Sequence, residues 1–382
     1  MRMLVLGAGL QGSACAFDLL ETTEASVTLA DCRFASLPKF LQPHEGKRLR
    51  LLTVDVRDES AMLAAMQAHD AVQCAIPYYF NFPMSRLALE AGVHFADLGG
   101  NTEIVREQQT LHESAAARGV SIMPDCGLAP GMANILAVEC IRRLDRTETV
   151  KLFVGGLPQH PQPPLDYQVV YSLEGVLDYY TTPSWVLRDG KPAEVDALSE
   201  LETVEFPEPV GVLEAFHTGG GVSTMPWVYE GRVQTMEYKT LRYPGHAHIM
   251  WAIRELGLID DRPVRVKGVE VSPRDLFITV VDPKLRRPDP MDLVAMKVAA
   301  RGERGGRPAV VAFQVLDYYD AERGISAMMR TTGYSLSIAG QMQVTGRVGP
   351  AGVRPAYEAV PFDSYVAALG ERGIVVEEVE VG

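Results

Sequence analysis

The N-terminal segment, residues 1–33, constrains the fold of this chain more than any other stretch. Residues 3–6 form a short apolar run, typical of a buried parallel strand, that leads directly into the turn Gly7-Ala8-Gly9-Leu10-Gln11-Gly12. Residues 13–20 carry apolar side chains at helical spacing, and a second apolar run ends at Asp31. This order of strand, glycine turn, helix, strand and acid predicts a unit that binds a dinucleotide.

The glycines of this turn have separate roles. Gly7 permits a sharp exit from the strand, Gly9 lets a pyrophosphate approach the backbone, and Gly12 lets the helix lie close to the sheet. The helix N-terminus at Leu10 and Gln11 would present unpaired N–H groups and the positive end of the helix dipole to the phosphates. A doubly wound domain that keeps the turn without binding a nucleotide is the alternative interpretation.

The acid at the end of the second predicted strand bears on the choice of cofactor. The Asp31 carboxylate can accept both hydroxyls of an adenosine ribose and would repel a 2′-phosphate, which favours NAD over NADP. Arg33 works against this preference, because a guanidinium there could pair with a phosphate. Further cofactor contacts are expected where the third and fourth strands end, at Asp55, Val56, Ala75 and Pro77.

The chain divides into two regions that differ in their predicted secondary structure and proline content. Strand and helix patterns alternate in the first region, whereas the second is rich in proline and in strand-like runs. We therefore predict an α/β protein with a Rossmann-type doubly wound parallel sheet and a second α+β domain with a mainly antiparallel sheet. The expected division places residues 1–130 and 324–382 in the dinucleotide-binding domain, and residues 131–323 in a domain for substrate binding and dimerisation.

Several elements are expected in the second half of the chain. Helical spacing in residues 324–342, interrupted near Gly333, predicts a helix that packs back on the first domain. The expected strands are residues 150–154, 264–271 and 276–281, the hairpin of 293–300 with 309–316, and 374–381.

Charge and cysteine content exclude several classes of partner. The net charge of −13 argues against nucleic acid and against an anionic membrane surface, since both require a basic face. The five cysteines include no CxxC pair, which predicts reduced thiols and no metal site. The chain enters a strand without a signal-like segment and has no apolar run of membrane-spanning length, so we expect a cytoplasmic protein that acts on a small molecule.

Two segments marked by glycine, residues 216–224 and 238–246, carry residue types suited to substrate binding. Lys239 and Arg242 in the second segment could hold a substrate carboxylate, which arginine binds in a bidentate manner. Tyr78 follows the proline that ends the fourth strand and would face the same crevice. A solvated basic loop is the alternative interpretation of the second segment.

Candidates for proton transfer lie in the same segments. His217 and His246 each belong to one of the glycine-marked segments and could act as the general base. Asp125 follows a predicted strand and precedes a Pro-Gly turn, so its carboxylate should face the crevice. The alternatives are structural histidines and, for Asp125, a cap for the helix that starts near Ala129.

The chain resembles the saccharopine dehydrogenase-like family, and most closely those members that use NAD to oxidise the ε-carbon of lysine. The resemblance covers nearly the whole chain and rests on Gly7 to Gly12 with Asp31, residues 125–131, 155–159 and 239–246, and Thr331-Thr332-Gly333-Tyr334. It implies that Arg242 holds the amino-acid carboxylate and that the protein is a homodimer formed through its second domain. Saccharopine reductases carry a second acid where this sequence has Ala129, a departure that counts against saccharopine.

The activity implied by the resemblance is oxidative deamination of the ε-amine of lysine. The product would be a semialdehyde that cyclises, with ammonia released, and His217 or His246 would be the base while Asp125 orients the amine or the water. Three alternatives remain: a reductase of the saccharopine or carboxynorspermidine dehydrogenase type, an NAD-dependent oxidoreductase for an unrelated amino or hydroxy acid, and a non-catalytic NAD-sensing protein.

Overall fold

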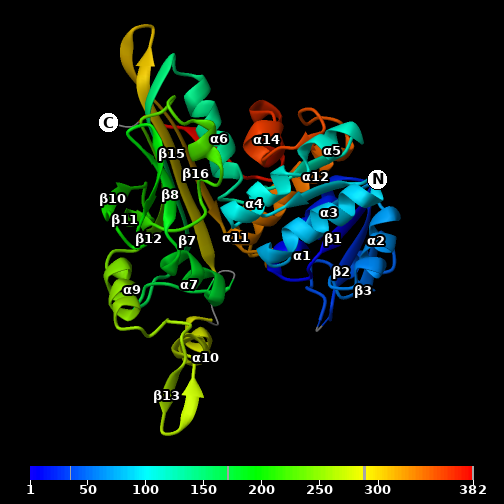
Figure 1. Ribbon diagram of the computed structural model, residues 1–382, viewed down its shortest axis with the longest axis horizontal. Coiled ribbons are helices and arrows are strands. Elements are labelled where there is room, and N and C mark those ends of the chain that lie inside the picture. The colour runs from blue at the N-terminus through cyan, green and yellow to red at the C-terminus, as the bar shows by residue number, and fades with distance from the viewer. Residues whose placement is uncertain (35, 170–171, 287–289, 381–382) are drawn as a thin grey trace.

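The computed structural model describes residues 1–382 except 35, 170–171, 287–289 and 381–382. It shows two domains side by side, one around a parallel sheet and the other around a tall mixed sheet (Figure 1). No helix among the described residues is long and apolar enough to cross a bilayer.

The N-terminal domain is a doubly wound parallel sheet, as predicted. Its strands lie in the order β17-β6-β5-β4-β1-β2-β3, and all pairs are parallel. The bounds are β1 (Arg2–Leu6), β2 (Ser26–Asp31), β3 (Leu49–Thr53), β4 (Ala71–Cys74), β5 (His94–Asp97), β6 (Ser121–Met123) and β17 (Gly352–Val353). The strand order reverses between β1 and β4, which is where ligands bind in such sheets.

Helices cover both faces of this sheet, so its strands are apolar throughout rather than alternating. In β1, every residue of the Met-Leu-Val-Leu run is fully buried. The helices are α1 (Leu10–Thr22), α2 (Glu59–Gln67), α3 (Asn81–Ala91), α4 (Thr102–Gln109) and α5 (His112–Ala117). The short 3-10 turn η2 (Tyr78–Phe80) connects β4 to α3.

The C-terminal part of the chain returns to the parallel sheet. Strand β17 pairs with β6, and α11 (Ala327–Met329), the π-helical turn η3 (Arg330–Tyr334) and α12 (Ser335–Val344) pack on α1 and on the sheet. The predicted interruption near Gly333 falls within η3. A Cβ atom on Gly333 would lie 2.7 Å from the Gln11 carbonyl oxygen, so glycine is required for this close approach to α1.

The second domain is built on a nine-stranded, mainly antiparallel sheet. The main path is β10-β11-β12-β7-β15-β16-β18; β8 pairs with β12, and β9 pairs with β8. Among the described strands of this sheet, β12 and β7 are the one parallel pair. The bounds are β7 (Arg146–Pro158), β8 (Ser184–Arg188), β9 (Lys191–Val195), β10 (Glu202–Glu205), β11 (Val212–His217), β12 (Thr235–Arg242), β15 (Asp292–Arg304), β16 (Arg307–Tyr318) and β18 (Glu377–Glu378). The predicted hairpin is β15–β16.

The remaining helices flank this sheet and the join between the domains. They are α6 (Met132–Arg142), α7 (Leu173–Thr181), α8 (Met225–Val228), α9 (His246–Glu255), α10 (Pro273–Leu285), α13 (Ala356–Ala359) and α14 (Phe362–Glu371). Helix α6 packs on the inner face of the sheet, against β7 and β15.

Three strand predictions need correction. Residues 276–281 lie in α10, because the Ser272 side chain accepts from the Asp275 N–H and Pro273 occupies the first turn, and these start signals outweigh the β-branched run. Residues 264–271 are two short strands, β13 (Val264–Val266) and β14 (Val269–Val271), divided by a turn at Lys267 and Gly268. The expected terminal strand 374–381 is reduced to β18, and residue 381 lies outside the described residues.

Candidate active site

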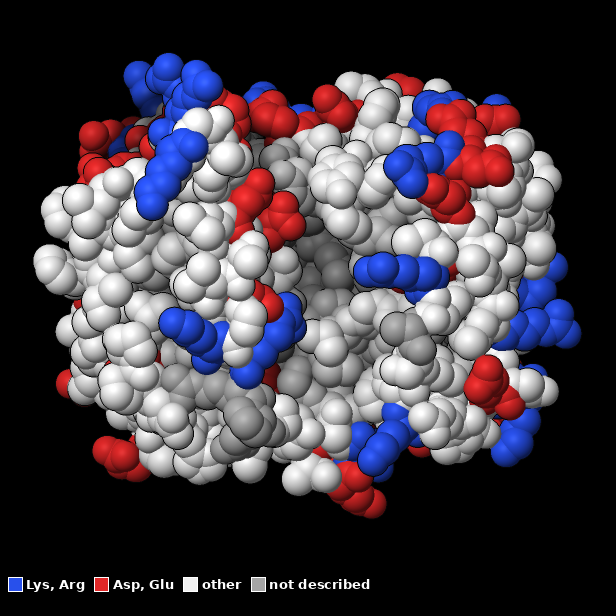
Figure 2. All heavy atoms as spheres, turned by 90° about the horizontal axis from the view of Figure 1, so that it is seen from below, with Lys and Arg blue, Asp and Glu red and all other residues white. Residues whose placement is uncertain are grey.

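A cavity of about 210 Å³ lies between the two domains. Figure 2 shows a hollow where the domains face one another. Three parts of the chain form the wall. The first domain contributes Gln11, Leu98, Gly99 and residues 127–130, the second contributes residues 154–156, Tyr179, Tyr180, Thr218, Gly219, Tyr238, Thr240 and Arg242, and the C-terminal helical segment contributes Met328 and Thr332.

Arg242 reaches this cavity because it is the last residue of strand β12. Side chains alternate along a strand, so Tyr238, Thr240 and Arg242 share the face that lines the cavity, whereas Lys239 projects from the opposite face. Lys239 Nζ donates instead to Glu202 Oε1 at 2.6 Å. The structure therefore does not bring Lys239 to the cavity, although Lys239 stands only three residues before Arg242 in the sequence.

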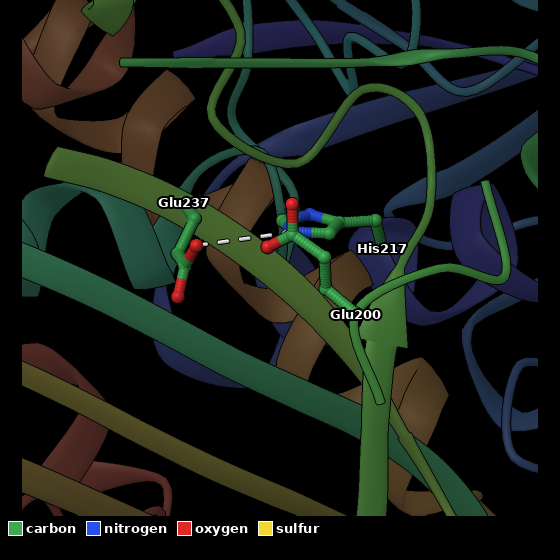
Figure 3. Close-up of side chains that lie close together, drawn as sticks. All are labelled: Glu200, His217 and Glu237. Carbon is green, nitrogen blue, oxygen red and sulfur yellow. Dashed lines mark hydrogen bonds and ion pairs between the residues drawn. The ribbon is translucent and has the colours of Figure 1, made fainter. Parts of the chain in front are cut away.

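His217 lies with Lys239 on the outer face of the second sheet. The two residues pair directly in the register of β11 and β12. His217 Nε2 lies 3.2 Å from Glu200 Oε2 and 3.8 Å from Glu237 Oε2 (Figure 3). Burial lowers the pKa of His217. This placement, across the sheet from Arg242, separates the imidazole from the cavity, so His217 is not positioned as a base there.

The cluster of Glu200, His217 and Glu237 has the composition of a metal site, with one ligand atom of each residue within 4.8 Å of the others. Arg188 fills its centre. Arg188 Nη2 lies 2.7 Å from Oε2 of both glutamates and 3.4 Å from His217 Nε2. Because a guanidinium already satisfies these atoms, we interpret the cluster as an ion-pair network.

His246 is the first residue of α9 and lies behind the cavity wall, with its side chain buried. Its Nε2 atom lies 2.9 Å from the Tyr180 hydroxyl, and its Nδ1 atom lies 3.0 Å from the Leu165 carbonyl oxygen. Burial, and then the nearby charge of Arg242, lower the pKa of His246 to about 3. An imidazole that stays neutral and has both nitrogens engaged is not suited to act as the general base.

Arg242 itself is held firmly at the wall. Its Nε donates to the Tyr180 hydroxyl at 3.1 Å and its Nη1 donates to the Leu241 carbonyl at 2.8 Å. The guanidinium also lies over the Tyr167 ring, 4.8 Å from its centroid. Among the described residues that line the cavity, Arg242 is the one cationic side chain, and the lining includes no carboxylate, imidazole or lysine.

Asp125 lies immediately behind the cavity wall. A Cβ atom on Gly99 would come within 2.1 Å of Asp125 Oδ1, so the carboxylate supports the loop that faces the cavity. The other oxygen accepts from Ser223 Oγ, and Oδ1 is buried without a hydrogen-bond partner. Burial raises the pKa of Asp125 to about 7; the Ser223 hydrogen bond opposes this shift and the nearby Asp97 charge adds to it. Asp125 therefore braces the wall and does not cap α6, which begins at Met132.

Tyr78 is not among the residues that line the cavity. It begins η2, is half-buried, and its Cβ lies 4.0 Å from the position of a Cβ on Gly100, which follows the cavity residue Gly99. The structure therefore places Tyr78 beside the cavity and not in its wall.

The glycine turn has the shape required for a dinucleotide. A Cβ on Gly9 would meet no atom within 4 Å, whereas a Cβ on Gly12 would lie 1.9 Å from the Gly7 carbonyl oxygen. The first N–H groups of α1 receive no side-chain cap. A cavity of about 490 Å³ beside the turn is lined by Ala8, Gly9, Leu10, Ser13, Pro38, Lys39, Phe40, Arg323, Gly324 and Met329. Open space, free N–H groups and two cations suit a pyrophosphate.

The Asp31 carboxylate accepts two backbone hydrogen bonds that the sequence does not predict. Its Oδ2 accepts from the Ala8 N–H at 2.7 Å and its Oδ1 accepts from the Arg33 N–H at 3.1 Å. Partial burial raises the pKa of Asp31, but these hydrogen bonds outweigh it and the net shift is downward. The ionised carboxylate therefore fixes the glycine turn while its remaining lone pairs are available to a ribose.

The other predicted cofactor contacts cluster around the same crevice edge. The Asp55 carboxylate is paired with Arg57, which lowers the pKa of Asp55 to about 2. Val56 packs against the core beside it. The Ala75 carbonyl oxygen lies 2.6 Å from the position of a Cβ on Gly7, and Pro77 precedes η2.

Sequence reasoning missed most of the second domain's contribution to the cavity. Tyr179 and Tyr180, at the end of α7, belong to the packed interior of the second domain and also line the cavity, and no sequence motif marks them. Tyr238 and Thr240 were available from the sequence, because they stand four and two residues before Arg242 and share its face once that segment is a strand.

Fold and cavity together define a two-domain protein in which a doubly wound sheet of the dinucleotide-binding type stands on one side of a cleft. The chain belongs to the saccharopine dehydrogenase family. The model of the saccharopine dehydrogenase NADP binding domain matches residues 3–123, and that of the saccharopine dehydrogenase C-terminal domain matches residues 127–374.

Named relatives are distant. The chain is 25% identical to the NADP-dependent, L-glutamate-forming saccharopine dehydrogenase of Schizosaccharomyces pombe over 68% of this chain and 58% of that enzyme. It is 22% identical to the carboxyaminopropylagmatine dehydrogenase of Synechocystis over 100% of this chain and 98% of that protein. The apo saccharopine dehydrogenase structure from Saccharomyces cerevisiae has a TM-score of 0.80 at 21% identity, covering 100% of both chains, and shares the fold.

Proposed function

We propose that this protein uses NAD to oxidise the ε-amine of L-lysine to a semialdehyde, which cyclises, with release of ammonia. The observation that carries the proposal is the charge of the cavity wall, where Arg242 is the one cation among the described lining residues. Lysine has one carboxylate for that guanidinium, whereas saccharopine has three. A narrow cavity of about 210 Å³ also suits the smaller molecule.

In this proposal Arg242 binds the α-carboxylate and the tyrosine-lined passage directs the side chain of lysine toward the wall formed by Leu98 and Gly99. NAD bound at the glycine turn would accept the hydride. As the hydride leaves the ε-carbon, the lone pair of the neutral ε-amine forms the C=N bond of an iminium ion. Water would then add to that carbon, and ammonia would leave to give the semialdehyde.

The described cavity wall has no group suited to remove a proton from the ε-ammonium near neutral pH. Burial raises the pKa of Tyr180 and of Tyr238 above their ordinary value, so neither phenol is an effective base. The substrate would enter as the neutral amine, and the reaction rate should rise with pH toward the pKa of the free ammonium, about 10.4.

A second candidate function is favoured by the relatives. Their printed names describe a saccharopine dehydrogenase and a carboxyaminopropylagmatine dehydrogenase, which supports a reductase that joins an amine to a semialdehyde. Such an enzyme would require a second amine as co-substrate. An NAD-sensing protein would bind the cofactor without turnover of any amine.

One assay separates these functions. Purified protein is given NAD with lysine, saccharopine, cadaverine or a hydroxy acid, and NADH formation and ammonia release are followed together across the pH range. Lysine alone should produce NADH and ammonia in equal amounts, faster at alkaline pH. Turnover of saccharopine without turnover of lysine would overturn the proposal.

The cofactor preference is a separate prediction and rests on Asp31. Its carboxylate would repel a 2′-phosphate, so kcat/KM should be higher with NAD than with NADP. Asp31→Ser should lower the ratio of kcat/KM with NAD to kcat/KM with NADP, because the repulsion is lost while Arg33 can still pair with the phosphate. The family model describes an NADP binding domain, so a higher kcat/KM with NADP in the unaltered protein would show that Arg33 outweighs Asp31.

A further inference from the structure

A continuous chain of hydrogen bonds runs from the protein interior to the cavity wall. It passes from the Leu165 carbonyl through both nitrogens of His246 to the Tyr180 hydroxyl, which also contacts Arg242 Nε. Every member is buried, and Tyr180 and Arg242 line the cavity. The proposed function does not explain why an imidazole and a phenol are arranged behind the carboxylate anchor.

The direction of each hydrogen bond follows from its partners. A carbonyl oxygen can only accept, so the Nδ1 atom of His246 must carry its hydrogen. The imidazole is neutral, and its Nε2 atom is therefore the acceptor for the Tyr180 hydroxyl. Arg242 Nε has no lone pair and donates to the same oxygen. The hydrogen of Tyr180 is thus committed to His246.

This arrangement leaves the Tyr180 oxygen able only to accept from any further partner, and Tyr180 lines the cavity. A phenolic oxygen has two lone pairs, and Arg242 Nε takes one of them. A ligand group that contacts the other must donate a hydrogen. Because that oxygen lies 3.1 Å from Arg242 Nε, the donor group would be a near neighbour of the carboxylate bound by the guanidinium. An ammonium on the α-carbon meets both conditions.

The electrostatic surroundings also suit an ammonium at this point. Glu214 pairs with Arg242 in the register of β11 and β12, and its buried carboxylate accepts from the backbone N–H groups of Gly245 and Ala247. This carboxylate also acts electrostatically on Tyr180, the pKa of which it helps to raise after the larger effect of burial. Tyr180 and Tyr238 both line the cavity, and aromatic rings interact favourably with cations.

We propose that Tyr180, oriented by His246, is the specificity-determining residue that accepts a hydrogen bond from the α-ammonium of the substrate and so selects α-amino acids. The proposal deepens the proposed function and rests on it for the identity of lysine. His246 is a positioning residue, because it acts only through Tyr180. Keto acids, which offer no donor at the α-carbon, would be excluded by the same oxygen.

The test compares lysine with 6-aminohexanoate, which has the same carboxylate and terminal amine but no α-amine. The unaltered protein should prefer lysine by at least tenfold in kcat/KM. Tyr180→Phe should reduce that ratio at least fivefold, mainly through the KM for lysine, and should change kcat/KM for 6-aminohexanoate by less than about threefold. An unchanged ratio in Tyr180→Phe would overturn the proposal.

Three further variants separate selection from packing. Tyr243→Phe removes another partly buried hydroxyl, which donates to the Pro158 carbonyl outside the cavity, and should leave the ratio unchanged. His246→Phe frees the Tyr180 hydrogen to point into the cavity and should lower the ratio although Tyr180 is present. His246→Gln, whose amide oxygen can still accept from Tyr180, should restore part of it.

A binding experiment keeps this inference distinct from the proposed function. Calorimetric titration of both ligands into the NADH-loaded protein measures the same ratio without turnover. If the unaltered protein binds lysine and does not oxidise it, the proposed function is wrong, while the effect of Tyr180→Phe on the binding ratio still decides the role of Tyr180. Equal affinity of the unaltered protein for both ligands would contradict the role of Tyr180 directly.

Discussion

Arg242 is the residue for which sequence and structure agree most closely, since the predicted anchor lies in the cavity wall. Arg242→Ala should lower kcat/KM for lysine at least tenfold, because a buried, bidentate pair loses about 2–5 kcal/mol when one partner is truncated. Arg242→Lys should recover only part of the loss, since the planar fork is absent. Steady-state kinetics with lysine measure both effects.

Cadaverine is the control for this anchor, because it has the amines of lysine and no carboxylate. Its turnover should be nearly unaffected by Arg242→Ala, and NAD affinity should also be preserved, since the glycine turn lies in the other domain. Equal losses for lysine and cadaverine would show that Arg242 shapes the cavity without binding the carboxylate.

Asp125 should make stability depend on pH. Burial raises its pKa to about 7, against about 3.9 in an unfolded chain, so between these values the native state holds an extra proton. The free energy of unfolding therefore falls as pH rises through this window, by up to roughly 1.4 kcal/mol per pH unit. Asp125→Asn cannot ionise and keeps an acceptor for Ser223, so it should lack this decline.

Urea unfolding of both proteins across the window measures the difference. The gap should open in favour of Asp125→Asn as pH rises and should level off above the native pKa. Asp97, whose pKa burial raises to about 6, is present in both proteins and contributes to both curves. Parallel curves would mean that Asp125 is already ionised in the folded protein at low pH.

The residues that sequence reasoning misplaced share one physical cause. Lys239 and His217 stand close to the correct segments, but a strand sends neighbouring side chains to opposite faces, and both face away from Arg242. Without a strand assignment for residues 235–242, the segment resembled a basic loop. His246 is a candidate base in the sequence because it stands in a glycine-marked segment. Its burial, which keeps the imidazole neutral, depends on tertiary packing and has no local sequence signal.

At the scale of elements, the glycine turn offers a matched pair of substitutions. Gly9→Val places a side chain in open space above the turn, where it would occupy the position of the pyrophosphate, so cofactor affinity should fall while the fold remains. Gly12→Val should instead destabilise the domain, because its Cβ would lie 1.9 Å from the Gly7 carbonyl oxygen.

Circular dichroism melting and NAD titration distinguish the two variants. Gly9→Val should melt within a few degrees of the unaltered protein without measurable NAD binding, and Gly12→Val should melt lower or fail to fold. Retained NAD affinity in Gly9→Val would make the turn purely structural.

The sequence predicts correctly those elements that have clear period and turn signals. It fails where the residue composition favours one type of element and the flanking start signals favour another. The βαβ order and the β15–β16 hairpin follow directly from apolar period and glycine placement. Residues 276–281 have the composition of a strand, yet the cap at Ser272 and the proline after it start a helix. Local start signals therefore deserve more weight than β-branched content in such runs.

At the scale of the whole molecule, the relative placement of the two domains determines which residues line the cavity. No local sequence pattern predicts that placement. Tyr179 and Tyr180 reach the cavity because the second domain presents the end of α7 to the turn at Leu98 and Gly99. The sequence does predict that the C-terminal segment returns to the first domain, and strand β17 shows that return by pairing with β6.

A buried ion pair joins the C-terminal segment to helix α1 of the first domain, and the last prediction concerns this pair. Arg372, just after α14, donates from Nε and Nη2 to the two carboxylate oxygens of Asp18 in α1, at 2.6 and 2.8 Å, and both side chains are at most 4% exposed. Arg372→Leu would leave the Asp18 charge buried without this partner, which costs about 3–5 kcal/mol. Chemical unfolding should show a loss of that order.

The double variant tests whether the cost comes from the stranded charge. Asp18→Asn combined with Arg372→Leu removes both charges, so it should be more stable than Arg372→Leu alone, because replacing a buried pair costs less than breaking it. Cofactor affinity should fall in Arg372→Leu only to the extent that α1 loosens, since Arg372 lies at the far end of that helix from the glycine turn. A double variant as unstable as Arg372→Leu would mean that the contacts of Arg372 with the Ala368 carbonyl and Thr22 hydroxyl, and not the ion pair, hold the C-terminal segment in place.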